Sequence, residues 1–128
     1  MSTHQYGLPA FPAGEDIPQD TVVKLDDGEW FLVAGPDDID DDTLVGISDT
    51  SANQGDSISP KRGSAVDYAR VNGEVEIEVG DKLQVADDGE VGAFDGETGS
   101  VCIGRAASRA VTDRLVRVEF ATLMEVGA

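Results

Sequence analysis

The chain has 128 residues, which suits a single domain that buries about two-thirds of the surface its unfolded form exposes. Its 26 acidic and 9 basic residues give a formal net charge of −17, and such a field repels phosphate backbones, which argues against a nucleic-acid-binding protein. No apolar run approaches the roughly 20 residues of a membrane span, and the N-terminus lacks the features of a secretory signal, so the sequence predicts neither a membrane protein nor one exported by that route.

The acidic excess fits either a disordered chain or a folded protein adapted to molar salt. Because 40% of the residues are apolar and many of them fall in period-two runs, the sequence favours a folded chain. In about 1 M salt the Debye length falls to about 3 Å, so self-repulsion between the charges nearly disappears. We therefore interpret the composition as salt adaptation, with which the low number of lysines, three, agrees.

The N-terminal segment is free of formal charge: residues 1–14 contain no Asp, Glu, Lys or Arg. Pro9 and Pro12 disfavour a helix, so we expect an extended arm over residues 1–20, followed by a single domain over residues 21–128. Two interpretations of the arm stay open.

The arm is either a frayed terminus or a docking segment that lays apolar anchors on a partner or adds a strand to it. As a docking segment, it would contact the partner through Tyr6, Leu8 and Phe11, which lie between and beside its prolines.

A first hairpin is predicted where residues 21–25 and 29–33 flank the dipeptide Asp27-Gly28. A two-residue loop would give two apolar cross-strand pairs: Leu25 with Trp30, and Val23 with Leu32. Residues 44–47 then predict a short strand.

Five aspartates occupy the six positions 37–42. A calcium loop would need alternating carboxylates followed by a glycine at its sharp turn, and no glycine follows until Gly46. A solvated acidic loop is the favoured interpretation, with calcium binding as the alternative. We predict no metal and no cofactor for this protein.

Residues 55–58 (GDSI) are similar to the nucleophile block of GDSL-type esterases, which would make Ser57 a nucleophile. A serine nucleophile needs a base within hydrogen-bond reach, and the single histidine, His4, lies in the predicted arm. We therefore interpret Gly55-Asp56 as a turn into a strand, and we predict that the protein is not an enzyme. A small hydrolase that uses Ser57 is the alternative, which Ser57→Ala would test.

A second hairpin is predicted around Asn72-Gly73, because apolar and acidic residues alternate strictly over residues 74–79. Its register would place Tyr68 opposite Ile77 and Val66 opposite Val79, with all four side chains on the buried face. A third hairpin is predicted around Asp88-Gly89, with Leu83 and Val85 entering the turn and Val91 and Phe94 leaving it.

The last third of the chain combines a buried strand with a cluster of arginines. Cys102, the single cysteine, lies in an apolar strand pattern and adjoins no Lys or His, so we expect a buried residue and not a reactive thiol. Residues 98–112 contain no acidic residue, and four of the nine basic residues lie in or just after this window: Arg105, Arg109, Arg114 and Arg117. They either neutralise acidic neighbours or form a patch that contacts an acidic partner or another copy.

Residues 105–111 predict a helical turn, and the alternation of Val116, Val118 and Phe120 with polar residues predicts a closing strand. Taken together, the pattern predicts an all-β fold, a small β-barrel or sandwich built from hairpins and preceded by the extended arm.

Several short motifs, in this order, resemble the capsid cement or head decoration proteins of tailed viruses: residues 44–48 (LVGIS), 54–58 (QGDSI), 80–83 (GDKL), 88–89 (DG), 101–106 (VCIGRA) and 115–120 (LVRVEF). The resemblance covers residues 22–120 and implies a small β-barrel.

The resemblance also implies a non-enzymatic protein on the outer capsid surface of the virion, with the major capsid protein as partner. Such proteins commonly bind as homotrimers and stabilise the shell. Together with the charge, it suggests a tailed virus of a salt-loving, haloarchaeal host. The alternative is a salt-adapted cellular β-domain that binds a carbohydrate or a protein surface.

Overall fold

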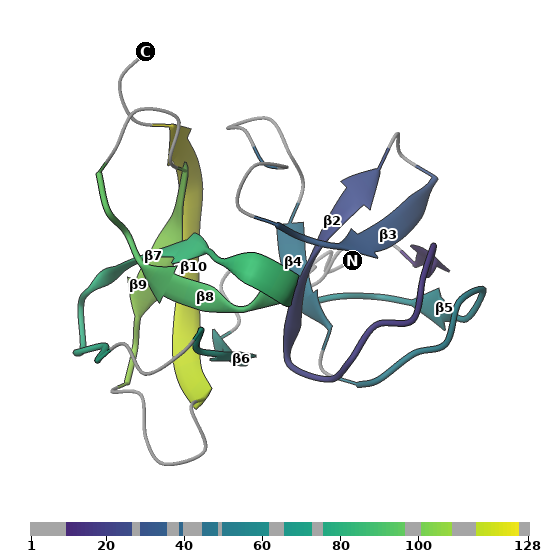
Figure 1. The fold of residues 1–128 in the computed structure, drawn as a ribbon, viewed down its shortest axis with the longest axis horizontal. Coiled ribbons are helices and arrows are strands. Elements are labelled where there is room, and N and C mark those ends of the chain that lie inside the picture. Colours follow the sequence, from purple (N-terminus) through teal and green to yellow (C-terminus); the bar gives the residue numbers. More distant parts are fainter. Residues whose placement is uncertain are drawn as a thin grey trace, which may run out of the picture.

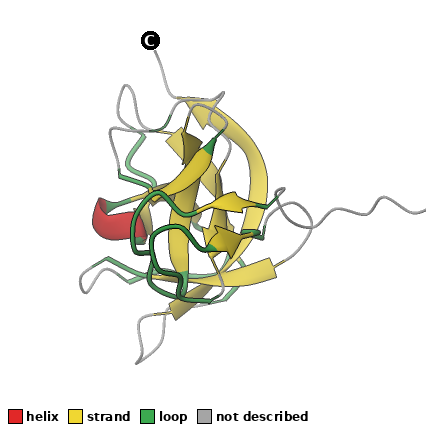
Figure 2. Cartoon of the chain, turned by 90° about the vertical axis from the view of Figure 1, so that its right-hand side faces the viewer, coloured by secondary structure: helices red, strands yellow, loops and turns green. Residues whose placement is uncertain are grey.

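The computed structural model describes residues 10–26, 29–35, 39, 45–48, 50–61, 66–72, 76–96, 101–108 and 115–125. These residues form ten β-strands and one 3-10 turn: β1 (Phe11–Pro12), β2 (Thr21–Asp26), β3 (Trp30–Val33), β4 (Val45–Ser48), β5 (Ser57–Ile58), β6 (Val66–Arg70), β7 (Lys82–Val85), η1 (Asp87–Gly89), β8 (Val91–Ala93), β9 (Val101–Ala106) and β10 (Leu115–Glu125). Strands make up almost all of the regular structure (Figure 2).

The strands form three sheets (Figure 1): a five-stranded sheet in the order β6-β10-β9-β7-β8, a three-stranded sheet in the order β3-β2-β4, and the pair β1-β5. Pairing within each sheet is antiparallel. The predicted all-β class is confirmed. Between the two edge strands of the five-stranded sheet, the described residues form one isolated bridge, which joins Val71, just after β6, to Val91, the first residue of β8. The edges are not joined by a continuous ladder, and the described chain is a sandwich and not a closed barrel.

The three-stranded sheet is the middle layer of this sandwich, because it is buried on both faces. Val22 in β2 points into the larger core with side chains of the five-stranded sheet such as Leu83 and Val118. Val23, the next residue, points into a second core with Phe31, Ala13, Ile17 and Ile58. Successive side chains of a strand point to opposite faces, so a single strand can bind two cores together.

The hairpin of β2 and β3 is confirmed, but its predicted register is wrong by one residue. Leu25 lies opposite Phe31, and Asp26 lies opposite Trp30, so the loop has three residues instead of two. This register turns Phe31, which is 0% exposed, into the second core, and leaves Trp30 41% exposed. A slip of one residue would exchange these two positions, so burial of Phe31 decides the register.

The hairpin predicted around Asn72-Gly73 is wrong for the residues that the structure describes. β6 pairs with β10, and residues 76–78 form no strand. Tyr68, expected on the buried face, is 50% exposed, and Val79 is 66% exposed. The expected alternation holds only around Ile77, which is buried between exposed Glu76 and Glu78. Residues 73–75 lie outside the described part.

The other predicted strands are confirmed. β7 and β8 form a hairpin with Val85 opposite Val91, closed by η1. β4, β5 and β10 lie where the sequence predicts them, and Cys102 is buried in β9. The helical turn expected over residues 105–111 is wrong at its start, since Arg105 and Ala106 are the last residues of β9.

Candidate interaction surfaces

Of the residues expected in the N-terminal arm, the structure describes 10–20, and these pack against the domain. Pro12 in β1 lies opposite Ser57 in β5, and Ala13 and Ile17 are buried. Phe11 is partly buried, with its ring edge-to-face against Phe31 at a centroid distance of 6.1 Å. The chain preceding residue 10, which contains Tyr6 and Leu8, lies outside the described residues.

Two of the four predicted arginines, Arg105 and Arg117, are described, and both are exposed on the outer face of the five-stranded sheet. Arg105 lies opposite Glu119, which is two residues from Arg117 in β10, so both arginines project from the same face. Arg109 and Arg114 belong to the β9–β10 connection, outside the described residues.

Two residues that sequence reasoning missed join these arginines. Lys82 in β7 lies opposite Arg105 and is exposed. Tyr68 in β6 lies opposite Arg117, and the guanidinium carbon of Arg117 is 5.9 Å from the centroid of the Tyr68 ring. Knowledge that β6 pairs with β10 would have placed Tyr68 beside the predicted Arg117. We call the surface formed by Tyr68, Lys82, Arg105 and Arg117 the basic sheet face.

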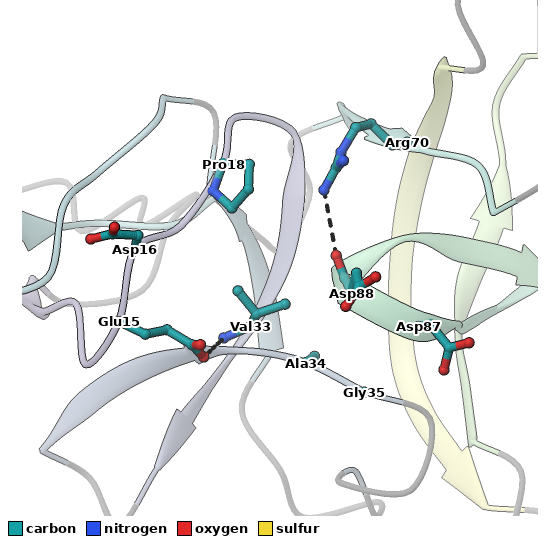
Figure 3. A pocket seen from close by; sticks show the side chains of 9 residues that line it. All are labelled: Glu15, Asp16, Pro18, Val33, Ala34, Gly35, Arg70, Asp87 and Asp88. Atoms are coloured by element: carbon teal, nitrogen blue, oxygen red, sulfur yellow. Dashed lines mark hydrogen bonds between the residues drawn. The ribbon is translucent and has the colours of Figure 1, made fainter.

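A second surface is a cleft of about 690 Å³ between η1 and the middle layer (Figure 3). Four carboxylates, one arginine and a short apolar floor line it: Glu15, Asp16, Asp87, Asp88, Arg70, Pro18, Val33, Ala34 and Gly35. Four negative charges against one positive charge give the lining a formal charge of −3. We call this surface the acidic cleft.

Backbone hydrogen bonds fix two of the cleft carboxylates. The backbone N–H of Val33 donates to Oε2 of Glu15 at 2.9 Å, and that of Gln54 donates to Oδ1 of Asp16 at 2.8 Å. Both side chains nevertheless belong to exposed residues, as do Asp87 and Asp88 of η1. The cleft therefore presents two carboxylates at defined positions, both from the segment before β2, and two further exposed carboxylates from η1.

Arg70, which sequence reasoning also missed, joins the layers at the edge of the acidic cleft. Its Nη2 donates to Oγ1 of Thr21 in β2 at 3.1 Å and to the carbonyl oxygen of Asp88 at 3.4 Å. Its Nη1 lies 3.7 Å from Oε2 of Glu90. These bonds tie β6 to both β2 and η1 and so join the two layers beside the cleft.

The described residues include neither of the chemical sites considered from the sequence, a serine nucleophile with a base beside it or a metal-binding group. Ser57 is exposed in β5, where it pairs with Pro12, and no group of three His, Cys, Asp or Glu side chains in the described part could hold a metal ion. Of the run at positions 37–42, only Ile39 is described, and it is buried. None of the described segments is a helix of the length and apolar character that crossing a membrane requires.

Comparison with solved structures gives a match to the head fiber gp8.5 N base of bacteriophage phi29, with a TM-score of 0.67 and 17% sequence identity over 94% of this chain and 97% of the other. At that identity the match shows a shared fold. Comparison with curated proteins gives no match. Residues 2–120 match the sequence model of the phage cement protein family. The match spans most of the 128 residues, so the chain belongs to the phage cement protein family and is located on the virion capsid.

Proposed function

We propose that the protein is a non-enzymatic cement that binds the outer surface of a tailed-virus capsid as a homotrimer and stabilises the shell against the pressure of packaged DNA. The observation that carries the proposal is the family match over residues 2–120. A trimer that holds several major capsid proteins at once gains avidity, because the second and third contacts form at high effective concentration.

Two parts of the chain supply the contacts in this proposal. The uncharged arm binds the capsid through Tyr6, Leu8 and Phe11, and the arginines at positions 105, 109, 114 and 117 contact either the capsid or a neighbouring copy. The contact of Phe11 with Phe31 supports an arm that is fastened to the domain at one end. Phe11 then serves both as the anchor of the arm and, through its exposed part, as a capsid contact.

We also propose that the host is a salt-loving organism, a haloarchaeon. Support comes from the net charge of −17 and from the presence of only three lysines. In about 1 M salt, acidic outer surfaces keep particles dispersed while their mutual repulsion is screened.

Removal of residues 2–9 tests the arm. Because Phe11 and Ala13 pack against Phe31 and its neighbours, this deletion leaves the second core intact. We expect the shortened chain to stay folded, as judged by circular dichroism, and to lose co-sedimentation with purified capsids. Binding equal to that of the full chain would contradict the role of the arm.

The stabilising role is tested on capsids that contain DNA. We expect decorated shells to release DNA at a higher temperature than bare shells, as followed by the fluorescence of a DNA-binding dye. Equal release temperatures would leave a capsid-bound protein without a cementing role, and would contradict the proposal.

A further inference from the structure

The basic sheet face concentrates positive charge on a strongly acidic protein. Three of the nine basic residues of the chain lie in two adjacent cross-strand rows of this face. One row contains Lys82, Arg105 and Glu119, and the other contains Arg117 and Tyr68. Glu119 is the one acidic residue among these five.

The two arginines of the basic sheet face are held in place before any partner binds. Nη1 of Arg105 donates to the carbonyl oxygen of Gly80 at 3.0 Å. The guanidinium carbon of Arg117 lies over the Tyr68 ring, 5.9 Å from its centroid, a cation–π contact that restricts the arginine side chain. Groups already fixed in position lose less conformational entropy on binding, so this face is suited to carboxylates.

The acidic cleft has the complementary chemistry and is built on other elements. Its carboxylates come from the segment before β2 and from η1, whereas the basic sheet face comes from β6, β7, β9 and β10. Glu15 and Asp16 are fixed by backbone N–H groups, and Asp87 and Asp88 are exposed.

We propose that the basic sheet face of one copy of this chain binds the acidic cleft of a second copy. The inference rests on the proposed assembly of several copies and names the surfaces that join them. Because the two surfaces differ, the contact is head-to-tail, and repetition of such a contact closes a ring when the rotation between copies permits. Each copy in a ring uses both surfaces once.

Salt acts on this contact in two opposite ways. Two copies that each carry a net charge of −17 repel one another at low ionic strength, and about 1 M salt removes most of this long-range repulsion. Arginine–carboxylate pairs that are shielded from solvent within the contact are screened much less. We therefore expect association to be stronger at about 1 M salt than at physiological salt.

Two variants of the full chain, each defective in one surface, test the proposal by sedimentation velocity. The face variant carries Arg105→Glu and Arg117→Glu. The cleft variant carries Asp87→Lys and Asp88→Asn, with Asn at position 88 because the backbone there has a φ of 58°, which Asn tolerates. Each variant alone should self-associate at least about tenfold more weakly than the unaltered chain.

The mixture of the two variants is the decisive measurement. The face variant keeps an intact cleft and the cleft variant keeps an intact face, so an equimolar mixture should form a one-to-one dimer that grows no further. Lys61→Glu, an exposed cation outside both surfaces, is the matched control for Arg117→Glu and should associate as the unaltered chain does.

The outcomes separate this interface from the assembly on which it rests. An unaltered chain that stays monomeric at both salt concentrations overturns the assembly and the interface together. An oligomer that the face variant retains in full overturns the interface alone, as does a mixture in which the two variants fail to pair. Capsid co-sedimentation of the chain that lacks residues 2–9 tests the proposed function separately, because these residues belong to neither surface.

Discussion

Gly89 lies where η1 passes closest to the middle layer, and it is buried with a φ of 70°. A Cβ atom at this position would lie 2.8 Å from the carbonyl oxygen of Val22 and 3.1 Å from Cγ1 of Val33. Its backbone N–H donates to the carbonyl oxygen of Ala34 at 2.9 Å. The residue thus fixes the distance between the two larger sheets, and only glycine satisfies both the backbone angle and the space.

We predict that Gly89→Ala lowers the free energy of unfolding by about 2–5 kcal/mol, since strain at a positive φ adds to overpacking. Gly96→Ala is the matched control, because Gly96 has a φ of 71° but nothing lies within 4 Å of its added Cβ. The control should cost about 1–2 kcal/mol. Urea denaturation measures both values, and equal costs would show that the contact with the middle layer carries no energy.

At the scale of single elements, the β2–β3 hairpin shows how burial selects a register. Phe31 is 0% exposed and Trp30 is 41% exposed, although a two-residue loop would bury the tryptophan. Burial of Phe31 in the second core contributes more to the stability of the fold than the preference of an Asp-Gly turn for a two-residue loop.

We predict that Phe31→Ala lowers the free energy of unfolding by about 3–5 kcal/mol, as expected for an aromatic residue removed from a core. Trp30→Ala should cost about 1 kcal/mol, because Trp30 is already 41% exposed and its removal leaves no cavity in the core. Thermal and urea unfolding of both variants give the comparison. A larger loss for Trp30→Ala would favour the two-residue register.

Elements that are local in the sequence could be predicted, and those that depend on distant partners could not. Asp-Gly turns flanked by apolar residues predicted the β2–β3 and β7–β8 hairpins, and alternation predicted β10. The partner of β6 is β10, which follows it by about 45 residues, and no turn signal encodes so distant a pairing. The Asn72-Gly73 dipeptide favours pairing of β6 with the residues that directly follow it. Pairing with β10 buries Val116 and Val118, and this burial outweighs the local preference of the turn.

The same limit applies to the candidate surfaces. A gap in the acidic pattern revealed Arg105 and Arg117 without any knowledge of the fold. Tyr68 and Lys82 join them through strand pairings that the sequence does not display. The acidic cleft gathers residues from position 15 to position 88, and carboxylates are too frequent in this chain for their sequence positions to indicate a site.

At the scale of the whole molecule, the net charge of −17 sets a dependence of stability on salt. We predict that the melting temperature rises between about 0.1 M and 1 M NaCl, as the Debye length falls from about 10 Å to 3 Å. A gain of about 2 kcal/mol in the free energy of unfolding would raise it by about 6 °C. Differential scanning calorimetry measures the shift.

The control for this prediction replaces four exposed carboxylates by amides, in Glu29→Gln, Glu76→Gln, Glu78→Gln and Glu119→Gln. Fewer repelling charges should make the melting temperature less sensitive to salt. The same salt dependence in both proteins would point to an origin of the effect other than repulsion between charges.

The position of β10 in the five-stranded sheet has a consequence for synthesis of the protein. Leu115–Glu125 pairs with β6 on one side and β9 on the other, so the strand of this sheet that is made last occupies an interior position. A nascent chain that ends before this strand carries β6 and β9 without their shared neighbour, and their apolar faces stay uncovered. The sheet is therefore completed only once residues 115–125 have been made, and a ribosome that stalls before residue 115 would present a target for chaperones.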